Sequence, residues 1–504
     1  MTDRSPKLRP YQIEGKRQTA QAMAEGVKRI LTCAPTGAGK TVYAASILCG
    51  AVRKKKRVVF LAHRRELIDQ SRDKALDSGV PDEMVGVIQA GTKPRANAPV
   101  QICSIDTLRA RRILPPADLI IVDEAHRSLA ASYRWLLGEY PDAKVIGLTA
   151  TPNRTDGQGL GDIYERLILI SRPSELIAQG YLVKPRVYSH PMTLDLEGVH
   201  VVAGEFNAKE VEQRANRPKL LGAIVDHWMQ LAKGRPTVGF AVSVAHSIAL
   251  TKEFVERGVA AEHIDGDMDV EQRREILARF KRGETTIVTN VDVLVEGWDA
   301  PWAKVLISAR PTMSLVRWLQ MCGRIMRPHD DVEALILDHA GNCARHGLPS
   351  FDHPWSLEGR PKRTKSTPAD PVLGTKQCPK CWALVESDTL QCYGVLPDGS
   401  PCEYLWTVKP VSVAEGTLEE VTAEDEVALA KVLAASKTRG QTRLELTPEL
   451  KRDYEKILRG AAFNGKSAAV AAAIFRRKHG GLPSNARLLE ERFFPGGRSM
   501  FEAT

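Results

Sequence analysis

The chain has 504 residues, of which 43% are hydrophobic, 26% charged and 6% aromatic, a composition that is typical of globular proteins and excludes a disordered or fibrous chain. No apolar run reaches the roughly 20 residues of a membrane span, and the start, MTDRSPKLRP, lacks the apolar run of a secretory signal, so we expect a cytoplasmic protein without membrane contact. The net charge of +10 suits a protein that binds polyanions, but other proteins also show it, so charge alone does not identify a nucleic-acid partner.

The first part of the chain predicts a doubly wound α/β domain over residues 1–170. Short apolar runs rich in Val, Ile and Leu precede turn signals, and helical stretches separate these runs. Strands that alternate with helices indicate parallel pairing, with helices on both faces of the sheet. The predicted strands are RILTCA, VVFLA, VQICSI, LIIVD and KVIGLTA.

The same pattern restarts in the second half and predicts another α/β domain over residues 180–345, with the strands TVGFAVS, ETTIVTN, AKVLISA and EALILD. Residues 346–376 are rich in Pro, Lys, Arg, Thr and Ser, which predicts an extended linker. A small cysteine module is expected at 377–406, and a helical, basic C-terminal region at 411–504. That last region is equally compatible with a DNA-contacting tail and with a solvated helix packed on the core.

The segment APTGAGKT, residues 34–41, follows the first predicted strand and opens a helix, which is the setting of a phosphate-binding loop. Its glycines let the backbone curl so that N–H groups point at phosphate oxygens. Lys40 can neutralise the β- and γ-phosphates of ATP, and the Thr41 hydroxyl can hold Mg²⁺. Ala34 stands where the general pattern has glycine, but the strand and helix on either side favour the loop over a plain glycine turn. The loop residues expected at the nucleotide are Thr36, Gly37, Ala38, Gly39, Lys40 and Thr41.

The strand LIIVD ends in two adjacent carboxylates, Asp123 and Glu124, at the carboxyl end of the predicted sheet. Ligands of open α/β sheets bind at this edge. Asp123 could reach the Mg²⁺ held by Thr41, and Glu124 could orient and deprotonate the attacking water. An isolated DEAH tetrapeptide could also be a solvated turn, but its place on an apolar strand argues against that interpretation.

These features resemble the superfamily 2 helicases, and the resemblance extends from residue 8 to about residue 340. It implies two tandem RecA-like, parallel-sheet P-loop NTPase lobes. LRPYQ, residues 8–12, resembles the adenine-reading motif, in which Arg9 and Gln12 would contact the base. In order, the other motifs of the first lobe are APTGAGKT (motif I), FLAHRREL (Ia), CSIDTL (Ib), VDEAH (II) and LTATP (III).

The second lobe carries VGFAVSVAHS, TNVDVLVEGWDAP and QMCGRIMRP, which resemble motifs IV, V and VI. By this resemblance Arg324 and Arg327, three residues apart on one helical turn, are arginine fingers for the γ-phosphate, although two arginines on a helix can also be a solvated face. The family residues that couple nucleotide state to lobe position match Gln320, Gly297 and Asp299. His126 would face Gln320 across the cleft, with a core or capping role as the alternative.

The resemblance also implies contacts with a nucleic-acid backbone, since hydroxyls, amides and short basic groups suit phosphates and read no base sequence. Thr107 and Ser243 could equally be helix caps. The residues that match the family's nucleic-acid contacts are His63, Arg64, Ser104, Thr107, Ser243, Thr289 and Asn290.

RPYQ, DEAH, EGWDAP and the late cysteines together look most like the RadD group of bacterial and phage helicases, related to the XPB and UvsW branch. This implies ATP-dependent movement on single-stranded, forked or branched DNA, with repair and recombination proteins as partners. An RNA helicase, a nucleotide switch that clamps or remodels a partner on DNA, and a restriction-type motor subunit are the alternatives.

Four of the nine cysteines lie close together as CPKC, with Cys378 and Cys381, followed by Cys392 and Cys402. Four thiolates can complete a tetrahedral site for structural zinc. The second pair is separated by nine residues, so the common ribbon spacing is only half met. A redox pair is the rival interpretation, but CPKC opens no βαβ helix.

Overall fold

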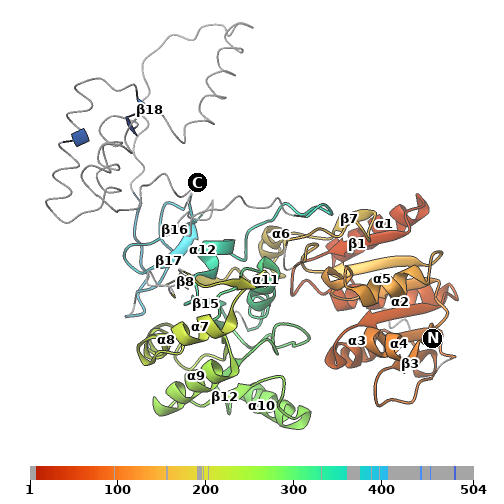
Figure 1. Ribbon diagram of the computed structural model, residues 1–504, viewed down its shortest axis with the longest axis horizontal. Coiled ribbons are helices and arrows are strands. Elements are labelled where there is room, and N and C mark those ends of the chain that lie inside the picture. The colour runs from red at the N-terminus through yellow and green to blue at the C-terminus, as the bar shows by residue number, and fades with distance from the viewer. Residues whose placement is uncertain are drawn as a thin grey trace, which may run out of the picture. The chain divides into compact units, whose positions relative to one another are not determined.

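The computed structural model divides into two compact units, residues 1–408 and 409–504 (Figure 1). In the second unit the described residues are β18 (Arg443–Leu444), the parallel strand β19 (Leu482–Pro483), and residues 454–455. The rest of the region predicted to be helical and basic lies outside the described residues. In the first unit the described residues are 7–95, 97–154, 157–189, 194, 196, 198–202, 204–330, 332–359, 375–387, 389–396 and 398–406.

Lobe one, residues 7–178, contains a fully parallel sheet of seven strands in the order β3-β4-β2-β5-β6-β1-β7. Its central strands are buried along their whole length, because helices cover both faces. The strands are β1 (Arg29–Cys33), β2 (Val58–Ala62), β3 (Val85–Ile88), β4 (Val100–Ser104), β5 (Leu119–Val122), β6 (Lys144–Thr149) and β7 (Arg166–Leu169). The helices are α1 (Pro10–Ala24), α2 (Lys40–Arg53), α3 (Arg65–Asp77), α4 (Ile105–Arg111), α5 (Ala131–Gly138) and α6 (Pro173–Ala178), with the short 3-10 helices η1 (Asp82–Met84) and η2 (Ala125–Arg127).

Lobe two begins at residue 186 and contains a second sheet, in the order β12-β13-β11-β14-β15-β8-β17-β16, together with a two-stranded hairpin. The sheet strands are β8 (Arg186–Ser189), β11 (Thr237–Phe240), β12 (Ala261–Ile264), β13 (Ile287–Asn290), β14 (Val305–Ser308), β15 (Leu335–Asp338), β16 (Thr375–Gln377) and β17 (Ala383–Glu386). The hairpin is β9 (Val201–Val202) and β10 (Glu205–Phe206). The helices are α7 (Ala208–Ala215), α8 (Pro218–Leu231), α9 (Val244–Glu256), α10 (Val270–Arg282), α11 (Leu315–Cys322) and α12 (Asn342–His346).

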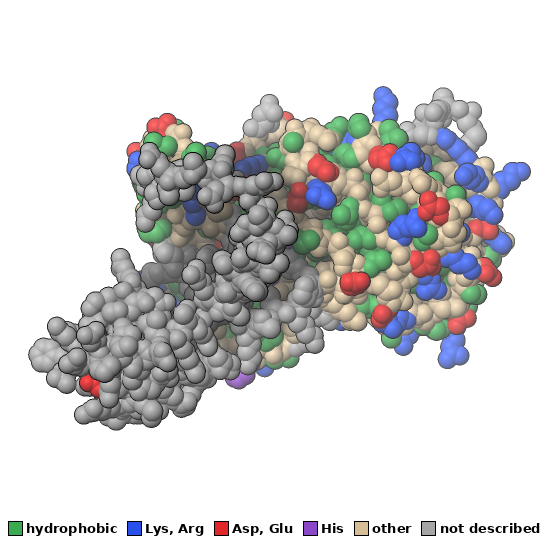
Figure 2. Space-filling view, turned by 90° about the horizontal axis from the view of Figure 1, so that it is seen from above, with side chains coloured by type: hydrophobic (Ala, Val, Ile, Leu, Met, Phe, Trp, Pro, Cys, Tyr) green, Lys and Arg blue, Asp and Glu red, His purple; other side chains and the backbone are tan. Residues whose placement is uncertain are grey.

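The two parallel α/β sheets confirm the predicted fold class. Every strand that the sequence predicted is present, and among the parallel strands of the two large sheets the sequence missed β3, β7, β8 and β12. Of these, β12 lies at a sheet edge and is only partly buried, and its sequence AEHI lacks a continuous apolar run. On the face of lobe one shown in Figure 2, basic and acidic side chains are interspersed. Among the described helices, none is long and apolar enough to cross a membrane.

The cysteine segment is built into lobe two instead of standing apart. β16 and β17 form an antiparallel hairpin, and β17 pairs antiparallel with β8, so the hairpin extends the lobe-two sheet. The core on this side is shared, because the four cysteines pack in one apolar cluster with residues of α8 and β15.

Residues 348–359, which we call the strap, leave lobe two after α12 and contact lobe one (Figure 1). Asp352 accepts hydrogen bonds from the Ser174 hydroxyl at 2.6 Å and from its amide at 3.1 Å. The Leu357 carbonyl accepts a bond from the Gly161 amide at 2.9 Å. The strap passes so close to lobe one that a Cβ atom on Gly159 would lie 2.0 Å from the Leu357 oxygen.

We expect Gly159→Ala to displace the strap, because the added methyl overlaps a backbone carbonyl. The cost should be about 1–3 kcal/mol, the usual range for overpacking. Thermal unfolding and limited proteolysis, with fragments mapped to the strap, measure the effect. Gly138→Ala is the matched control, since its Cβ would meet nothing within 4 Å. An unchanged unfolding temperature and cleavage pattern for Gly159→Ala would contradict the docking of the strap.

Candidate active site and metal centre

The phosphate-binding loop connects β1 to α2 at the carboxyl end of the lobe-one sheet. Gly37 and Gly39 have φ angles of 90° and 77°, a left-handed backbone that glycine adopts without strain, and Gly39 caps α2. Lys40 is the first residue of α2, and its ammonium group donates to the carbonyls of Ala34 and Pro35 at 3.2 and 3.4 Å. Thr41 is exposed beside it. The loop thus offers the ammonium, hydroxyl and helix N-terminus that a triphosphate with Mg²⁺ needs.

Asp123 and Glu124 directly follow β5, and Asp123 accepts a hydrogen bond from the Glu124 amide at 3.0 Å. Burial, together with the neighbouring Glu124 carboxylate, raises the pKa of Asp123 to about 7. Burial also lowers the pKa of Lys40, while the charges of Glu124 and Asp123 oppose that shift. The three groups therefore share one buried electrostatic environment, in which Asp123 and Thr41 could hold Mg²⁺.

Glu124 is buried and has an unusual backbone, with φ at 46°. Its carboxylate lies 3.3 Å from His126 Nδ1 and accepts a hydrogen bond from the Gln320 amide of lobe two at 3.5 Å. Burial alone would raise the pKa of Glu124, but the bond and charge of His126 hold it below its ordinary value. His126 and Gln320 therefore meet at Glu124, which keeps this group ionised and oriented as a candidate base.

Arg327 of lobe two lies against the phosphate-binding loop. A Cβ on Gly37 would stand 3.3 Å from Arg327 Cγ, and the Arg327 guanidinium pairs with Asp299. Arg324 is placed differently: its guanidinium is buried and donates to the carbonyls of Trp298 and Val295, the latter at 2.6 Å. The prediction that both arginines share a helical turn is wrong, because α11 ends at Cys322. Arg327 thus lies where a finger is needed, whereas Arg324 holds the loop between β13 and β14.

Gln12 is engaged with the phosphate-binding loop, and its contact with adenine stays a prediction. Gln12 is buried, and its amide nitrogen donates to the carbonyls of Ala38 and Gly39 at 3.2 and 3.1 Å. Its amide oxygen accepts from the Arg9 amide at 2.9 Å, so Gln12 connects the start of α1 to the phosphate-binding loop. The Arg9 guanidinium instead lies over the ring of Tyr181, 4.4 Å from its centre.

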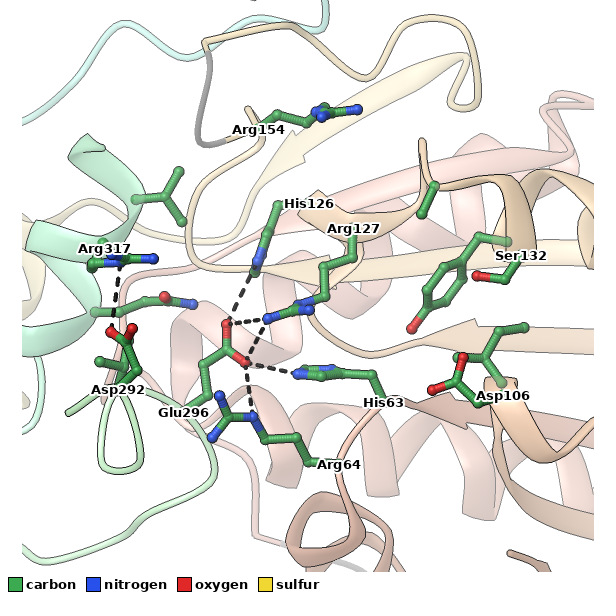
Figure 3. Close-up of a pocket in the computed structure, with 16 residues that line it drawn as sticks. His63, Arg64, Asp106, His126, Arg127, Ser132, Arg154, Asp292, Glu296 and Arg317 are labelled. Carbon is green, nitrogen blue, oxygen red and sulfur yellow. Dashed lines mark hydrogen bonds and ion pairs between the residues drawn. The ribbon is translucent and has the colours of Figure 1, made fainter. Parts of the chain in front are cut away.

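Glu296, which the sequence analysis missed, forms the densest ion cluster between the lobes (Figure 3). It lies on the loop between β13 and β14, and its side chain is 5% exposed. From lobe one, His63 Nε2 lies 2.8 Å from its carboxylate, Arg127 3.3 Å, Arg64 3.6 Å and His126 3.7 Å. Burial alone would raise the pKa of Glu296, but His63 and the nearby cations keep it well below its ordinary value. A charged residue inside the apolar run VLVEGW was the available signal.

The cluster borders a cavity of about 600 Å³ between the lobes. Its lining brings basic side chains of both lobes together with two further acids, Asp106 and Asp292. The basic residues of the lining are His63, Arg64, His126, Arg127, Arg154 and Arg317.

Five of the seven predicted nucleic-acid contacts have their side chains engaged or buried elsewhere. Ser104 caps α4 by accepting from the Thr107 amide, and Ser243 caps α9 by accepting from the His246 amide. Thr107 is 8% exposed, and Thr289 and Asn290 are fully buried and hydrogen-bonded within lobe two. For Thr289 and Asn290 the prediction is wrong, because β13 is a central strand whose side chains bond to α9 and β11. His63 and Arg64 do line the cavity between the lobes.

Two family profiles match the chain in the lobes just described. The profile of the type III restriction enzyme res subunit matches residues 5–154, and the helicase conserved C-terminal domain matches residues 219–329. A 51.5 kDa protein of a Lactococcus phage (isolate 7-9) is 33% identical over 353 residues, which are 69% of this chain and 74% of the phage protein. The chain belongs to the superfamily 2 helicases.

Other relatives of this helicase agree with that assignment. The IRC3 protein of Saccharomyces cerevisiae, whose name places it among ATP-dependent helicases, is 30% identical, and the match covers 67% of this chain but 52% of the yeast protein. A type I restriction enzyme EcoAI endonuclease subunit of Escherichia coli is 24% identical over 63% of this chain and 44% of that protein. A fragment of an HsdR subunit from Vibrio vulnificus shares the fold, with a TM-score of 0.55, 21% identity, and coverage of 70% of this chain and 69% of that one. The helicase is therefore an ATP-dependent enzyme.

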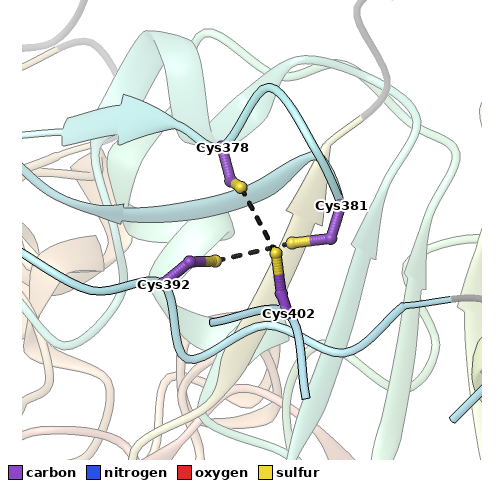
Figure 4. Close-up of side chains that lie close together, drawn as sticks. All are labelled: Cys378, Cys381, Cys392 and Cys402. Carbon is purple, nitrogen blue, oxygen red and sulfur yellow. Dashed lines mark hydrogen bonds between the residues drawn. The ribbon is translucent and has the colours of Figure 1, made fainter. Parts of the chain in front are cut away.

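The helicase also has four buried cysteines whose sulfurs converge (Figure 4). All four sulfurs lie within 4.8 Å of one another, with Cys378 and Cys402 at 3.6 Å and Cys381 and Cys392 at 3.5 Å. Sulfurs around a tetrahedral zinc ion, with Zn–S bonds of about 2.3 Å, stand about 3.8 Å apart.

Backbone geometry around these sulfurs also fits a metal ion. The amides of Lys380 and Gly394 donate to the sulfurs of Cys378 and Cys392 at 3.4 and 3.3 Å, which favours thiolates. A Cβ on Gly394 would lie 2.5 Å from the Cys381 sulfur, so only glycine leaves room there. The four residues could therefore hold a structural zinc ion, which would join β17 to the following loops.

We expect the purified full-length helicase to carry about one zinc ion per chain, as measured by elemental analysis. Cys392→Ser removes one zinc ligand, and Gly394→Ala places a methyl group against the sulfur of a second ligand, Cys381. Each variant should therefore bind less than half an equivalent of zinc. Cys49→Ser makes the same chemical change in lobe one, outside the cluster, and should leave the zinc content unchanged. Less than half an equivalent in the unmodified protein would exclude the site.

Proposed function

We propose that this helicase uses ATP hydrolysis at the seam between its lobes to move along DNA or remodel it. The observation that carries the proposal is the position of Glu124, which bonds to Gln320 of lobe two and, through His126, adjoins the cluster around Glu296. The candidate hydrolytic group is therefore connected to the residues that line the cavity between the lobes. Such a connection would let a bound strand and a bound nucleotide affect each other.

In the proposed mechanism the lobe-one loop binds the triphosphate and lobe two completes the site. Lys40 would neutralise the terminal phosphates, and Mg²⁺ held by Thr41 and Asp123 would supply charge neutralisation when bound. Glu124 would orient and deprotonate the attacking water, and the Arg327 guanidinium would leave Asp299 for the γ-phosphate. Loss of the γ-phosphate removes what the lobes share, so hydrolysis would allow them to separate.

DNA is the proposed polymer because the cavity between the lobes is rich in basic groups that suit phosphates. Among the relatives, an XPB protein of Kineococcus radiotolerans, 25% identical over 64% of this chain and 58% of that protein, bears the name of a DNA 3'-5' helicase. We further propose a role like that of the RadD group, on branched or damaged DNA in repair and recombination. The similarity to restriction enzyme subunits makes a translocating restriction-type motor the second candidate.

ATPase activity should rise in the presence of DNA and respond more weakly to RNA. Single-stranded, duplex and forked DNA and single-stranded RNA should be compared at one stated salt concentration, because phosphate contacts make binding steeply salt-dependent. Lys40→Ala and Glu124→Gln should abolish hydrolysis while Glu124→Gln still binds ATP, and Glu139→Gln, an exposed glutamate of lobe one, is the control. Stronger stimulation by RNA would indicate an RNA helicase, and binding without strand separation or roadblock displacement would indicate a clamp.

Arg327→Ala should retain ATP binding within about tenfold and lose turnover by about 10³-fold or more, because an arginine finger acts on the transition state. Nucleotide binding measured by fluorescence and steady-state turnover separate the two effects. Arg257→Ala, which removes an arginine paired with Asp226 on the surface of lobe two, should change neither. Equal losses of binding and turnover in Arg327→Ala would argue for a structural role.

A further inference from the structure

Glu296 occupies a position that an anion from outside the chain could also occupy. Figure 3 shows its carboxylate paired with four basic side chains, and all four belong to lobe one. The four are His63, Arg64, His126 and Arg127, which we call the basic quartet. They follow β2 and β5, two adjacent parallel strands, so one sheet edge presents all of them.

The quartet is open to the cavity on one side. Arg127 is 42% and Arg64 31% exposed at the side chain, although both contact a carboxylate that is 5% exposed. Arg154 and Arg317 line the same cavity beyond the quartet. A strand lying in the cavity could therefore reach the two arginines without unfolding either lobe.

A carboxylate and a phosphodiester carry the same charge and accept the same hydrogen bonds from guanidinium and imidazole groups. We propose that the basic quartet is a phosphate site for the nucleic-acid strand, that Glu296 fills it when no strand is bound, and that a backbone phosphate displaces Glu296. This inference rests on the proposed function. Glu296 is thus an internal competitor that strand binding must remove.

Displacement of Glu296 would also affect Glu124, the candidate base for hydrolysis. His126 lies between two carboxylates, with Nε2 3.7 Å from Glu296 and Nδ1 3.3 Å from Glu124. When a phosphate replaces Glu296, the partner of Nε2 changes, and so does the orientation that His126 gives to Glu124. The competitor therefore makes ATP hydrolysis depend on the strand.

The lobes have other contacts that would survive the loss of Glu296. Arg273 pairs with Glu66 at 3.2 Å, and the Gln70 amide donates to the Gly297 carbonyl. A variant of Glu296 should therefore keep the lobes in contact. An effect of that variant on DNA binding can then be assigned to the anion site and not to a general separation of the lobes.

Glu296→Gln is the direct test, since it keeps the shape and removes the charge. We expect single-stranded DNA, measured with a labelled oligo-dT of about 20 nucleotides at 100 mM salt, to bind at least fivefold more tightly, at the low end of typical coupling energies. ATPase activity without DNA should rise, and its stimulation by DNA should shrink. Glu262→Gln is the matched control: it removes the same charge from lobe two, where Glu262 pairs with Arg279 inside the lobe. It should leave DNA affinity and DNA stimulation unchanged.

Arg127→Gln distinguishes the proposed phosphate site from a set of ion pairs that only hold the two lobes together. If the quartet binds phosphate, Arg127→Gln should weaken DNA binding and reduce the salt slope by about one, opposite in direction to Glu296→Gln. Shifts in the same direction for both variants, or an unchanged affinity for Glu296→Gln, would overturn the proposal. A wild-type enzyme that hydrolyses ATP without any response to nucleic acid would instead refute the proposed function, so the two failures are distinguishable.

Discussion

The structure depends on one constraint: a carboxylate taken out of water must be matched by cations, and the cations that match Glu296 are on the other lobe. Removing an ion from water costs several kcal/mol when it is left without partners. The loop that carries Glu296 can therefore be buried only against His63 and the other basic side chains of lobe one. The same approach of the lobes brings Gln320 to Glu124 and Arg327 to Gly37. Pairing at the seam and assembly of the nucleotide site thus occur together.

Lobe two includes chain segments beyond its parallel strands. The strap runs from α12 to the edge of lobe one near Ser174, and from residue 375 the chain again belongs to lobe two, where β17 adds to the sheet beside β8. The cysteine cluster anchors the hairpin that completes this edge. Opening of the lobes therefore acts on the strap, because it begins after α12 of lobe two while Asp352, Leu357 and Gly359 contact lobe one.

The parts of this protein that could be predicted from sequence are those whose signal is local. Buried parallel strands appear as continuous apolar runs, and Lys40 and Asp123 stand next to such strands in recognisable order. Glu296 could not be found in this way, since its partner His63 is 233 residues away. The bonds of Gln12 to the Ala38 and Gly39 carbonyls were missed too, because they depend on how α1 packs against the loop. The partners of Glu296 and Gln12 are thus set by contacts between segments that lie far apart in the sequence.

The conformation of Glu124 shows why hydrolysis should be a property of the seam and not of lobe one alone. A left-handed backbone at a non-glycine residue costs of order 1–3 kcal/mol, so it persists only when neighbours hold it. Asp123 holds the amide, His126 holds the carboxylate from its own lobe, and Gln320 holds it from the other lobe. Without lobe two, one of these three restraints is absent. The candidate base is therefore fully oriented only when both lobes are in place.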